Sequence, residues 1–260
     1  MVQAPSRRDR ARAATTEEIK QTARRILIEQ GPEAVTLRAI ARDMGVTAPA
    51  LYRYFASHEE LIRGVAGDIF GELADEIHAA IEAAGAASGG GLTEKMIAAC
   101  RGFRQWALGH RAEFGLLFGT PLPGVDVGDD DFTEECARRF AGTFYELFLE
   151  LWRKKPFPVP PPEEIVPGLR EQLTRYGEGI GAAIPLGALL TFLRCWVRLY
   201  GIVSMEVFGH LGFALDDPGP IFEITLAELA TLVGLEYPTA RPPGGPAARR
   251  PGVAATRRPA

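Results

Sequence analysis

The sequence predicts an all-α protein in which a small N-terminal unit of three helices precedes a larger bundle of helices. Three observations lead to this prediction. Apolar residues recur at three- and four-residue spacing through most of the chain, as on one face of a helix. Helix-capping patterns stand at residues 15–18 and 57–60, each with a hydroxyl residue followed three positions later by glutamate. No stretch alternates apolar and polar residues in the way of a half-buried strand.

The capping patterns define the first and the fourth helix. The first helix opens at 15–18 and ends at Gly31-Pro32. Residues 1–14 contain four arginines without helical periodicity and are predicted to be a disordered basic arm. The fourth helix opens at 57–60 and is predicted to leave the N-terminal unit as a long stem, with one apolar side made of Leu61, Val65, Ile69, Leu73, Ile77 and Ile81.

Between these two helices, the pattern indicates two short helices joined by a tight turn. The first, beginning at Leu37, stops at Gly45, because only a residue without Cβ sits comfortably in the left-handed position after a helix end. Thr47 is predicted to cap the second, and Pro49 lies in its first turn, where the missing N–H is harmless. The residues predicted to point inward are Leu51, Tyr54 and Phe55.

This arrangement is typical of a helix-turn-helix that reads DNA. A second helix whose first exposed turn is short and uncharged fits into the major groove, and Arg53 is placed to reach guanine or phosphate. Residues 15–63 are therefore predicted to bind a double-stranded DNA operator. The predicted contact residues are Thr36, Arg38, Thr47, Ala48, Pro49, Tyr52, Arg53 and Tyr54.

Residues 16–63 resemble the DNA-binding head of the tetracycline-repressor (TetR) family of bacterial regulators. The matching runs are 40–47, 49–55 and 59–61. The resemblance implies an all-helical homodimeric repressor that binds a palindromic operator and whose second domain binds a small effector. Where the family usually has a lysine before Glu-Glu-Leu, this chain has His58, which the resemblance makes a further DNA-binding residue. Histidine can donate a hydrogen bond to phosphate, but it is mostly uncharged at neutral pH.

The composition is that of a soluble globular protein. The chain has 260 residues, 47% of them apolar and 24% charged, enough for a head and one larger domain. The longest uncharged apolar run, 180–193, is too short to span a bilayer, and no secretory signal is visible. The three cysteines, at 100, 136 and 195, form no disulfide framework. We expect a cytoplasmic protein without membrane contact.

Charge is distributed unevenly along the chain. Residues 1–63 carry 11 Lys/Arg and 8 Asp/Glu, a net charge of +3, whereas residues 64–240 carry 13 and 25, a net charge of −12. Residues 241–260 add five arginines and no acid. A basic end on an acidic body is suited to orienting on a phosphate backbone, although both balances are also compatible with solvated surface.

The second domain, residues 64–237, is predicted to bind an effector and to dimerise, and 238–260 is predicted to be a disordered Pro/Arg tail. Its middle is rich in aromatic residues, which suits a lipophilic or aromatic effector; packing of these rings as core is the alternative. The candidate effector residues are Phe103, Trp106, Phe114, Phe118, Phe144, Phe148 and Trp152.

A helix expected at about 186–211 is apolar on nearly every side, so it must be covered on every side. A partner subunit is one cover, helped by a second apolar helix at 220–234; the core of one subunit is the alternative. The candidate dimer-interface residues are Leu193, Val197, Tyr200, Ser204, Phe208, Leu229 and Leu232. The positions of Trp196, Gly201 and Glu206 also resemble a C-terminal type in some TetR members marked by these three residue types.

Two other functions were weighed. An enzyme is not indicated, because the chain has no nucleophile elbow, P-loop or dinucleotide-binding turn. Its four histidines are scattered without metal-ligand spacing, so neither a metal nor a cofactor is expected. A redox-responsive regulator acting through Cys100, Cys136 or Cys195 is the other alternative, although cysteines in apolar helical contexts are usually inert.

Overall fold

The computed structural model describes residues 6–87, 91–119 and 131–238, and these residues form ten α-helices and two short 3-10 helices. No strand occurs in this part of the chain, which confirms the all-α prediction. Residues 1–5 of the predicted arm, residues 88–90 and 120–130, and most of the expected tail lie outside the described residues.

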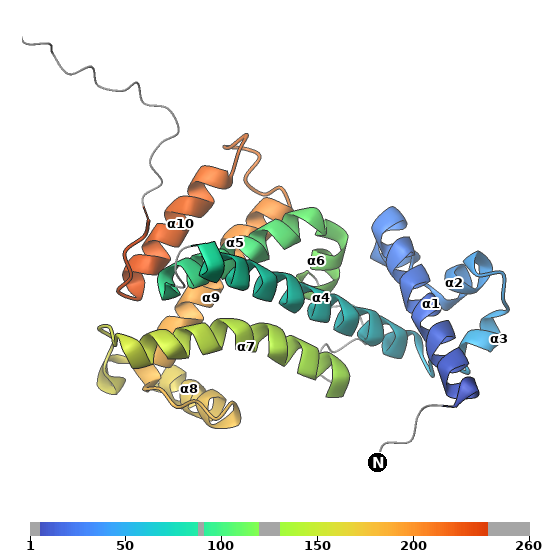
Figure 1. Cartoon of the computed structure of the whole chain (residues 1–260), viewed down its shortest axis with the longest axis horizontal. Helices are drawn as coiled ribbons and strands as arrows, with labels where there is room; N and C mark the ends of the chain where they lie inside the picture. Colours follow the sequence, from blue (N-terminus) through green and yellow to red (C-terminus); the bar gives the residue numbers. More distant parts are fainter. Residues whose placement is uncertain (1–5, 88–90, 120–130, 239–260) are drawn as a thin grey trace, which may run out of the picture.

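The N-terminal head consists of α1 (Arg7–Gln30), α2 (Leu37–Asp43), α3 (Ala48–Leu51) and the first turns of α4 (His58–Ala87). Its core is formed by apolar side chains from all four helices, which are almost completely buried: Ile19, Ile26, Ile40, Leu51 and Leu61. In Figure 1 the head lies on the right and the remaining helices on the left.

Helix α1 begins eight residues earlier than predicted, so the prediction of a disordered arm is wrong for residues 7–14. Ser6 is the N-cap, and its side chain accepts a hydrogen bond from the Asp9 amide at 3.2 Å, while the Asp9 carboxylate accepts one from the Ser6 amide at 3.1 Å. The hydroxyl of Thr15 does not cap a helix; it donates to the Ala11 carbonyl within α1.

In the body, α5, α6 and α7 pack directly on α4, and α8, α9 and α10 complete the bundle around them. Helix α4 lies between α5 and α7 and contacts both along its length (Figure 1). The apolar side predicted for it is buried from Leu61 to Ile77, so one helix about 45 Å long crosses the expected domain boundary at residue 63. The body helices are α5 (Leu92–Gly109), α6 (Arg111–Phe118), α7 (Asp131–Lys154), α8 (Pro167–Gly179), α9 (Leu186–Val207) and α10 (Gly219–Leu232).

Between α7 and α8, a proline-rich segment crosses the start of α9. The first turn of α9 approaches this segment so closely that a Cβ on Gly187 would lie 2.1 Å from the Pro160 carbonyl oxygen. Helix α9 is long and apolar enough to pass a composition test for a membrane span, as core helices of soluble proteins also do. Here it packs against α5, α7, α8 and α10.

Candidate nucleic-acid interface and ligand cavity

The turn that carries the predicted DNA-reading helix is built as its sequence suggested. The Thr36 hydroxyl accepts a hydrogen bond from the Ala39 amide at 3.1 Å and so caps α2. Gly45 has φ +67°, the left-handed conformation predicted for it. Leu51 and Phe55 are buried in the head core, and the backbone continues past α3 through a hydrogen bond from the Phe55 amide to the Leu51 carbonyl at 3.1 Å.

The opposite side of α3 is open to solvent. Thr47, Pro49 and Arg53 are exposed, and Tyr52 retains 57% of its surface. Thr47 makes no side-chain capping bond, contrary to the prediction, because the first turn is closed by its backbone carbonyl instead. The Thr47 hydroxyl is therefore not committed to the helix. Together with exposed Arg38 of α2, these residues form one face whose hydrogen-bonding groups and aromatic edge suit base and phosphate contact. Ala48 is half-buried beside them.

Two of the predicted contact residues have other partners. Tyr54 is half-buried against the head core, and the Arg12 guanidinium lies over its ring at 5.7 Å. The His58 Nε2 lies 2.6 Å from the Val35 carbonyl oxygen. Because a carbonyl only accepts, this nitrogen carries the proton and joins α4 to the link between α1 and α2. The predicted phosphate contact from this nitrogen is therefore wrong.

The fourth helix is capped at its start as predicted. The Ser57 hydroxyl accepts a hydrogen bond from the Glu60 amide at 3.1 Å. The Glu60 carboxylate accepts a hydrogen bond from the Ala56 amide, one residue before Ser57, whose amide is the donor in the predicted capping pattern. Both bonds fix the angle between the stem and the reading helix.

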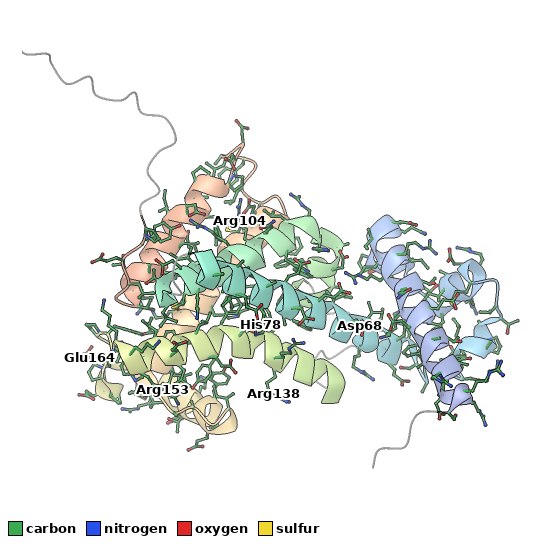
Figure 2. The ribbon with its side chains drawn as sticks, in the orientation of Figure 1. Asp68, His78, Arg104, Arg138, Arg153 and Glu164 are labelled. Atoms are coloured by element: carbon green, nitrogen blue, oxygen red, sulfur yellow. The ribbon has the colours of Figure 1, made fainter. Side chains whose placement is uncertain are left out.

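Ion pairs join the head to the stem and to the body. Lys20 of α1 pairs with Asp68 of α4, which Figure 2 places where the stem meets α1. One turn further along α1, Arg24 donates to Glu72 of α4 at 2.6 Å and to Glu113 of α6 at 3.4 Å. Burial raises the pKa of Asp68 although Lys20 opposes the shift. Through Arg24, α1 of the head contacts a buried carboxylate of the body.

Within the body, an apolar cavity of about 80 Å³ lies between α5, α7, α9 and α10. Aromatic rings from α7 and α9 form one wall and aliphatic side chains from α10 the other. No charged side chain of the described residues lines it. The lining residues are Met96, Ile97, Cys100, Phe144, Phe148, Phe192, Cys195, Trp196, Leu199, Leu226, Leu229, Ala230, Val233 and Leu235.

Only two of the seven predicted effector residues, Phe144 and Phe148, line this cavity. The other five do not line it. Trp152 packs edge-on against Phe157, at 5.1 Å between ring centroids. The remaining four lie outside the cavity lining, and three of them are completely buried: Phe103, Trp106 and Phe114, with half-buried Phe118 beside them. Ring contacts of 4.9–6.1 Å tie the phenylalanines together, because aromatic side chains at helical spacing fill the core where helices meet.

The cavity residues missed by the sequence analysis come mainly from α9 and α10. Phe192, Cys195 and Trp196 sit on one side of α9, which the sequence marked as apolar all round. That signal identified the helix but not the side that faces a void. Arg104 of α5 and Glu206 of α9 bind each other through two hydrogen bonds of 2.7 and 2.5 Å. Figure 2 shows Arg104 on α5, on the side of the body near α10.

The two thiols in the cavity are held in their neutral form. Burial raises the pKa of Cys100 to about 12 and that of Cys195 to about 11. Since the thiolate is the reactive form, both positions disfavour reaction with oxidants. Cys136 falls in the stretch of α7 whose side chains lie outside the described part of the chain.

Several apolar side chains of α9 and α10 are exposed to solvent. Val197 and Phe208 of the predicted dimer interface are among them, and Ser204 lies between these two on the same side of α9. Met205, Ile221 and Ile224, which were not among the candidates, are also exposed. We call these six residues the α9–α10 face.

Other candidates for the interface lie elsewhere. Leu229 is buried within the chain and lines the cavity, so its assignment to the interface is wrong. The Tyr200 hydroxyl donates to the Phe118 carbonyl at 2.6 Å, and Leu193 packs on the cluster around Leu173. Leu232 is half-buried.

Comparison with known proteins gives consistent matches over most of the chain. Residues 19–65 match the family model of bacterial regulatory proteins of the tetR family, and residues 96–229 match a tetracyclin repressor-like C-terminal domain. The chain is 30% identical over 219 residues to the HTH-type transcriptional regulators Rv1816 of Mycobacterium tuberculosis and Mb1846 of Mycobacterium bovis, covering 84% of this chain and 91% of each relative.

Solved structures share the fold. The crystal structure of SCO4313 aligns with a TM-score of 0.66 at 30% identity, covering 87% of this chain and all of that one. RolR, solved in complex with resorcinol, aligns with a TM-score of 0.53 at 15% identity, covering 87% of this chain and 90% of its own. At that identity, the second match shows the fold alone.

Proposed function

Because the chain belongs to the tetR family of bacterial regulatory proteins, and is thus a DNA-binding transcriptional regulator, we propose that it acts as a cytoplasmic homodimeric repressor. In this proposal two heads bind the half-sites of a palindromic operator. A small, uncharged apolar effector in the body releases them.

The reading of bases is assigned to the exposed face of α3. Tyr52 and Arg53 are exposed in the turn directly after α3, between Leu51 and Phe55, which are both buried in the head core. The fixed position of this segment is important because discrimination between bases requires hydrogen-bond donors and acceptors at fixed positions in the groove. Arg38 and Thr47 flank this face and are assigned contacts to the DNA backbone or to base edges.

Dimerisation is assigned to the α9–α10 face. Two heads read successive major grooves only when they are held about 34–36 Å apart, and a dimer interface in the body provides that spacing. Several exposed apolar side chains on two adjacent helices are unusual on a monomer surface and favour a protein partner.

The effector class follows from the cavity lining. Carboxylates and ammonium groups would lose their hydration without gaining a charged partner, so the cavity favours neutral, apolar molecules. A void of about 80 Å³ is smaller than the ~150 Å³ that accommodates benzene in an engineered protein cavity. Effector entry therefore requires the lining side chains to move.

Two ring contacts connect the cavity wall to the stem helix α4. The Phe144 ring in the cavity wall lies 5.6 Å from Phe140, and Phe140 lies 6.0 Å from Phe70 of α4. Close-packed rings do not compress, so displacement of the wall is passed to the helix that carries the head. A small rotation of α4 changes the separation of the two heads and weakens operator binding.

The observation that carries the proposal is the exposed Thr47–Arg53 face on a packed three-helix head. To test it, the wild-type protein is used to select an operator from a random duplex library. The affinities of the wild type and of Arg53→Ala for that operator are then compared. Loss of a bidentate base contact is expected to weaken operator binding by ~1–3 kcal/mol at each half-site. Arg175→Ala, in exposed α8, is the matched control and should bind as the wild type does.

An Arg53→Ala variant with unaltered operator affinity and unaltered preference for the selected sequence would show that α3 is presented differently. A wild-type protein that selects no sequence at all would contradict sequence-specific binding.

A further inference from the structure

The inner side of α1 changes character along its length. Ile19, Ala23 and Ile26 lie on one side of the helix and are buried in the head core. Arg8 and Arg12, placed 11 and 7 residues before Ile19, fall on the same side, since these separations are close to whole turns of a 3.6-residue helix. The side of α1 that packs in the head core therefore carries two exposed arginines in the turns that precede the core residues.

Arg12 fixes this extension against the reading helix. Its Nη2 donates to the Arg53 carbonyl oxygen at 3.0 Å, and its guanidinium lies over the Tyr54 ring. Figure 1 shows the first turns of α1 reaching the same end of the head as α3. Arg8, one turn before Arg12, therefore lies on the side of α1 that carries the contact to Arg53.

The charge around Arg8 suits an anionic partner. In the described part of the chain, Arg8 has no ion pair with any carboxylate. Asp9, the acid next to it, already accepts the Ser6 amide as part of the helix cap. Arginines that are neither buried nor paired, next to a helix that reads bases, have the chemistry of phosphate contacts.

We propose that the first two turns of α1 form a second DNA contact, in which Arg8 binds a backbone phosphate beside the half-site and Arg12 positions the helix. The contact rests on the proposed DNA binding by α3 but adds a residue outside the helix-turn-helix. It supplies affinity without sequence discrimination, because every duplex presents the same phosphates.

The test compares two arginines of the same two turns. Arg10 lies two residues, or about 200°, around the helix from Arg8, so it points to the opposite side. Full-length wild type, Arg8→Gln and Arg10→Gln are titrated against the selected operator and an unrelated duplex by fluorescence anisotropy across a series of salt concentrations. Circular dichroism confirms that each variant keeps its helix content.

Removing one phosphate contact from each subunit of the dimer is expected to reduce the slope of log affinity against log salt by about 1.8, which is about sixtyfold in affinity at 0.1 M salt. Arg8→Gln should show this loss equally on both duplexes, and Arg10→Gln should match the wild type. Equal losses for both variants, or no loss for Arg8→Gln, would overturn the proposal while leaving operator recognition by α3 intact. Loss of operator preference in the wild type itself would instead contradict the proposed function.

Discussion

Glu113 is a buried carboxylate on α6, and the charge that faces it comes from the head. Its side chain is 4% exposed, and Arg24 of α1 lies 3.4 Å away. Replacing Arg24 by methionine leaves this carboxylate buried without a cation. A lost hydrogen bond to a buried charge is worth roughly 2 kcal/mol, so we expect Arg24→Met to lower the free energy of unfolding by about that amount in urea denaturation.

The neighbouring Arg25 provides the control for this experiment. It pairs with Glu29 and Asp43, but all three side chains are largely exposed, and exposed pairs contribute at most about 1 kcal/mol. A double variant, Arg24→Met with Glu113→Met, should recover part of the stability, because an apolar pair has no charge to leave unsolvated. An Arg24→Met variant no less stable than Arg25→Met would show that Glu113 is solvated by other means.

Local sequence patterns were enough to predict the conformation or orientation of some residues but not of others. Gly45 and the inward direction of Leu51 were predictable because each follows from helix geometry within a few positions. The hydrogen bond from His58 to Val35 was not, because it joins residues 23 positions apart. Whether Phe103 fills the core or lines a void depends on which helices meet around it, and periodicity carries no information on that.

At the level of single helices, the start of α1 illustrates competition between two similar signals. Both Ser6 to Asp9 and Thr15 to Glu18 have a hydroxyl residue followed three positions later by an acid. The earlier pair caps the helix. The intervening residues include alanine and arginine, which favour helix, so nothing in 10–14 stops the helix once it has started.

Helix α9 and the proline-rich crossing form a contact that a single methyl group should disrupt. A Cβ at Gly187 would lie 2.1 Å from the Pro160 carbonyl oxygen, and backbone at that point must move to admit it. Overpacking of this kind costs about 1–3 kcal/mol, and we expect Gly187→Ala to lower the thermal midpoint accordingly.

Gly71, in the middle of α4, is the control for that variant. A Cβ there meets no atom within 4 Å, so Gly71→Ala should gain stability from helix propensity, by roughly 0.5–1 kcal/mol. Opposite shifts of the thermal midpoint for the two glycines are thus predicted. A Gly187→Ala variant as stable as the wild type would mean that the crossing segment yields freely.

Over the whole molecule, the head and the body differ in net charge and in the sites they contain. The acidic body contains the cavity, and residues 1–63, with a net charge of +3, contain the exposed arginines of the head, so attraction to DNA is concentrated where α3 is presented. The order and approximate limits of α9 and α10 were predictable from proline, glycine and apolar periodicity. Their packing was not, because α9 is apolar on nearly all sides and its sequence does not say which side faces α7, which faces the cavity and which remains exposed.

That exposed side leads to a prediction about assembly. Val197 retains 65% of its surface at the centre of the α9–α10 face, and Val166, before α8, retains 69% away from it. A glutamate at position 197 would be buried without a partner in a dimer, whereas one at 166 would stay in water. We expect Val197→Glu to be monomeric by light scattering at micromolar concentration and Val166→Glu to remain dimeric.

The same two variants separate assembly from DNA reading. A monomeric Val197→Glu protein keeps its head, so it should still bind duplex DNA weakly, but it loses the second half-site and with it most of the preference for the palindrome. If Val197→Glu stays dimeric and binds the operator as tightly as Val166→Glu does, the subunits meet through another surface, and the exposed side chains of α9 and α10 need a different partner.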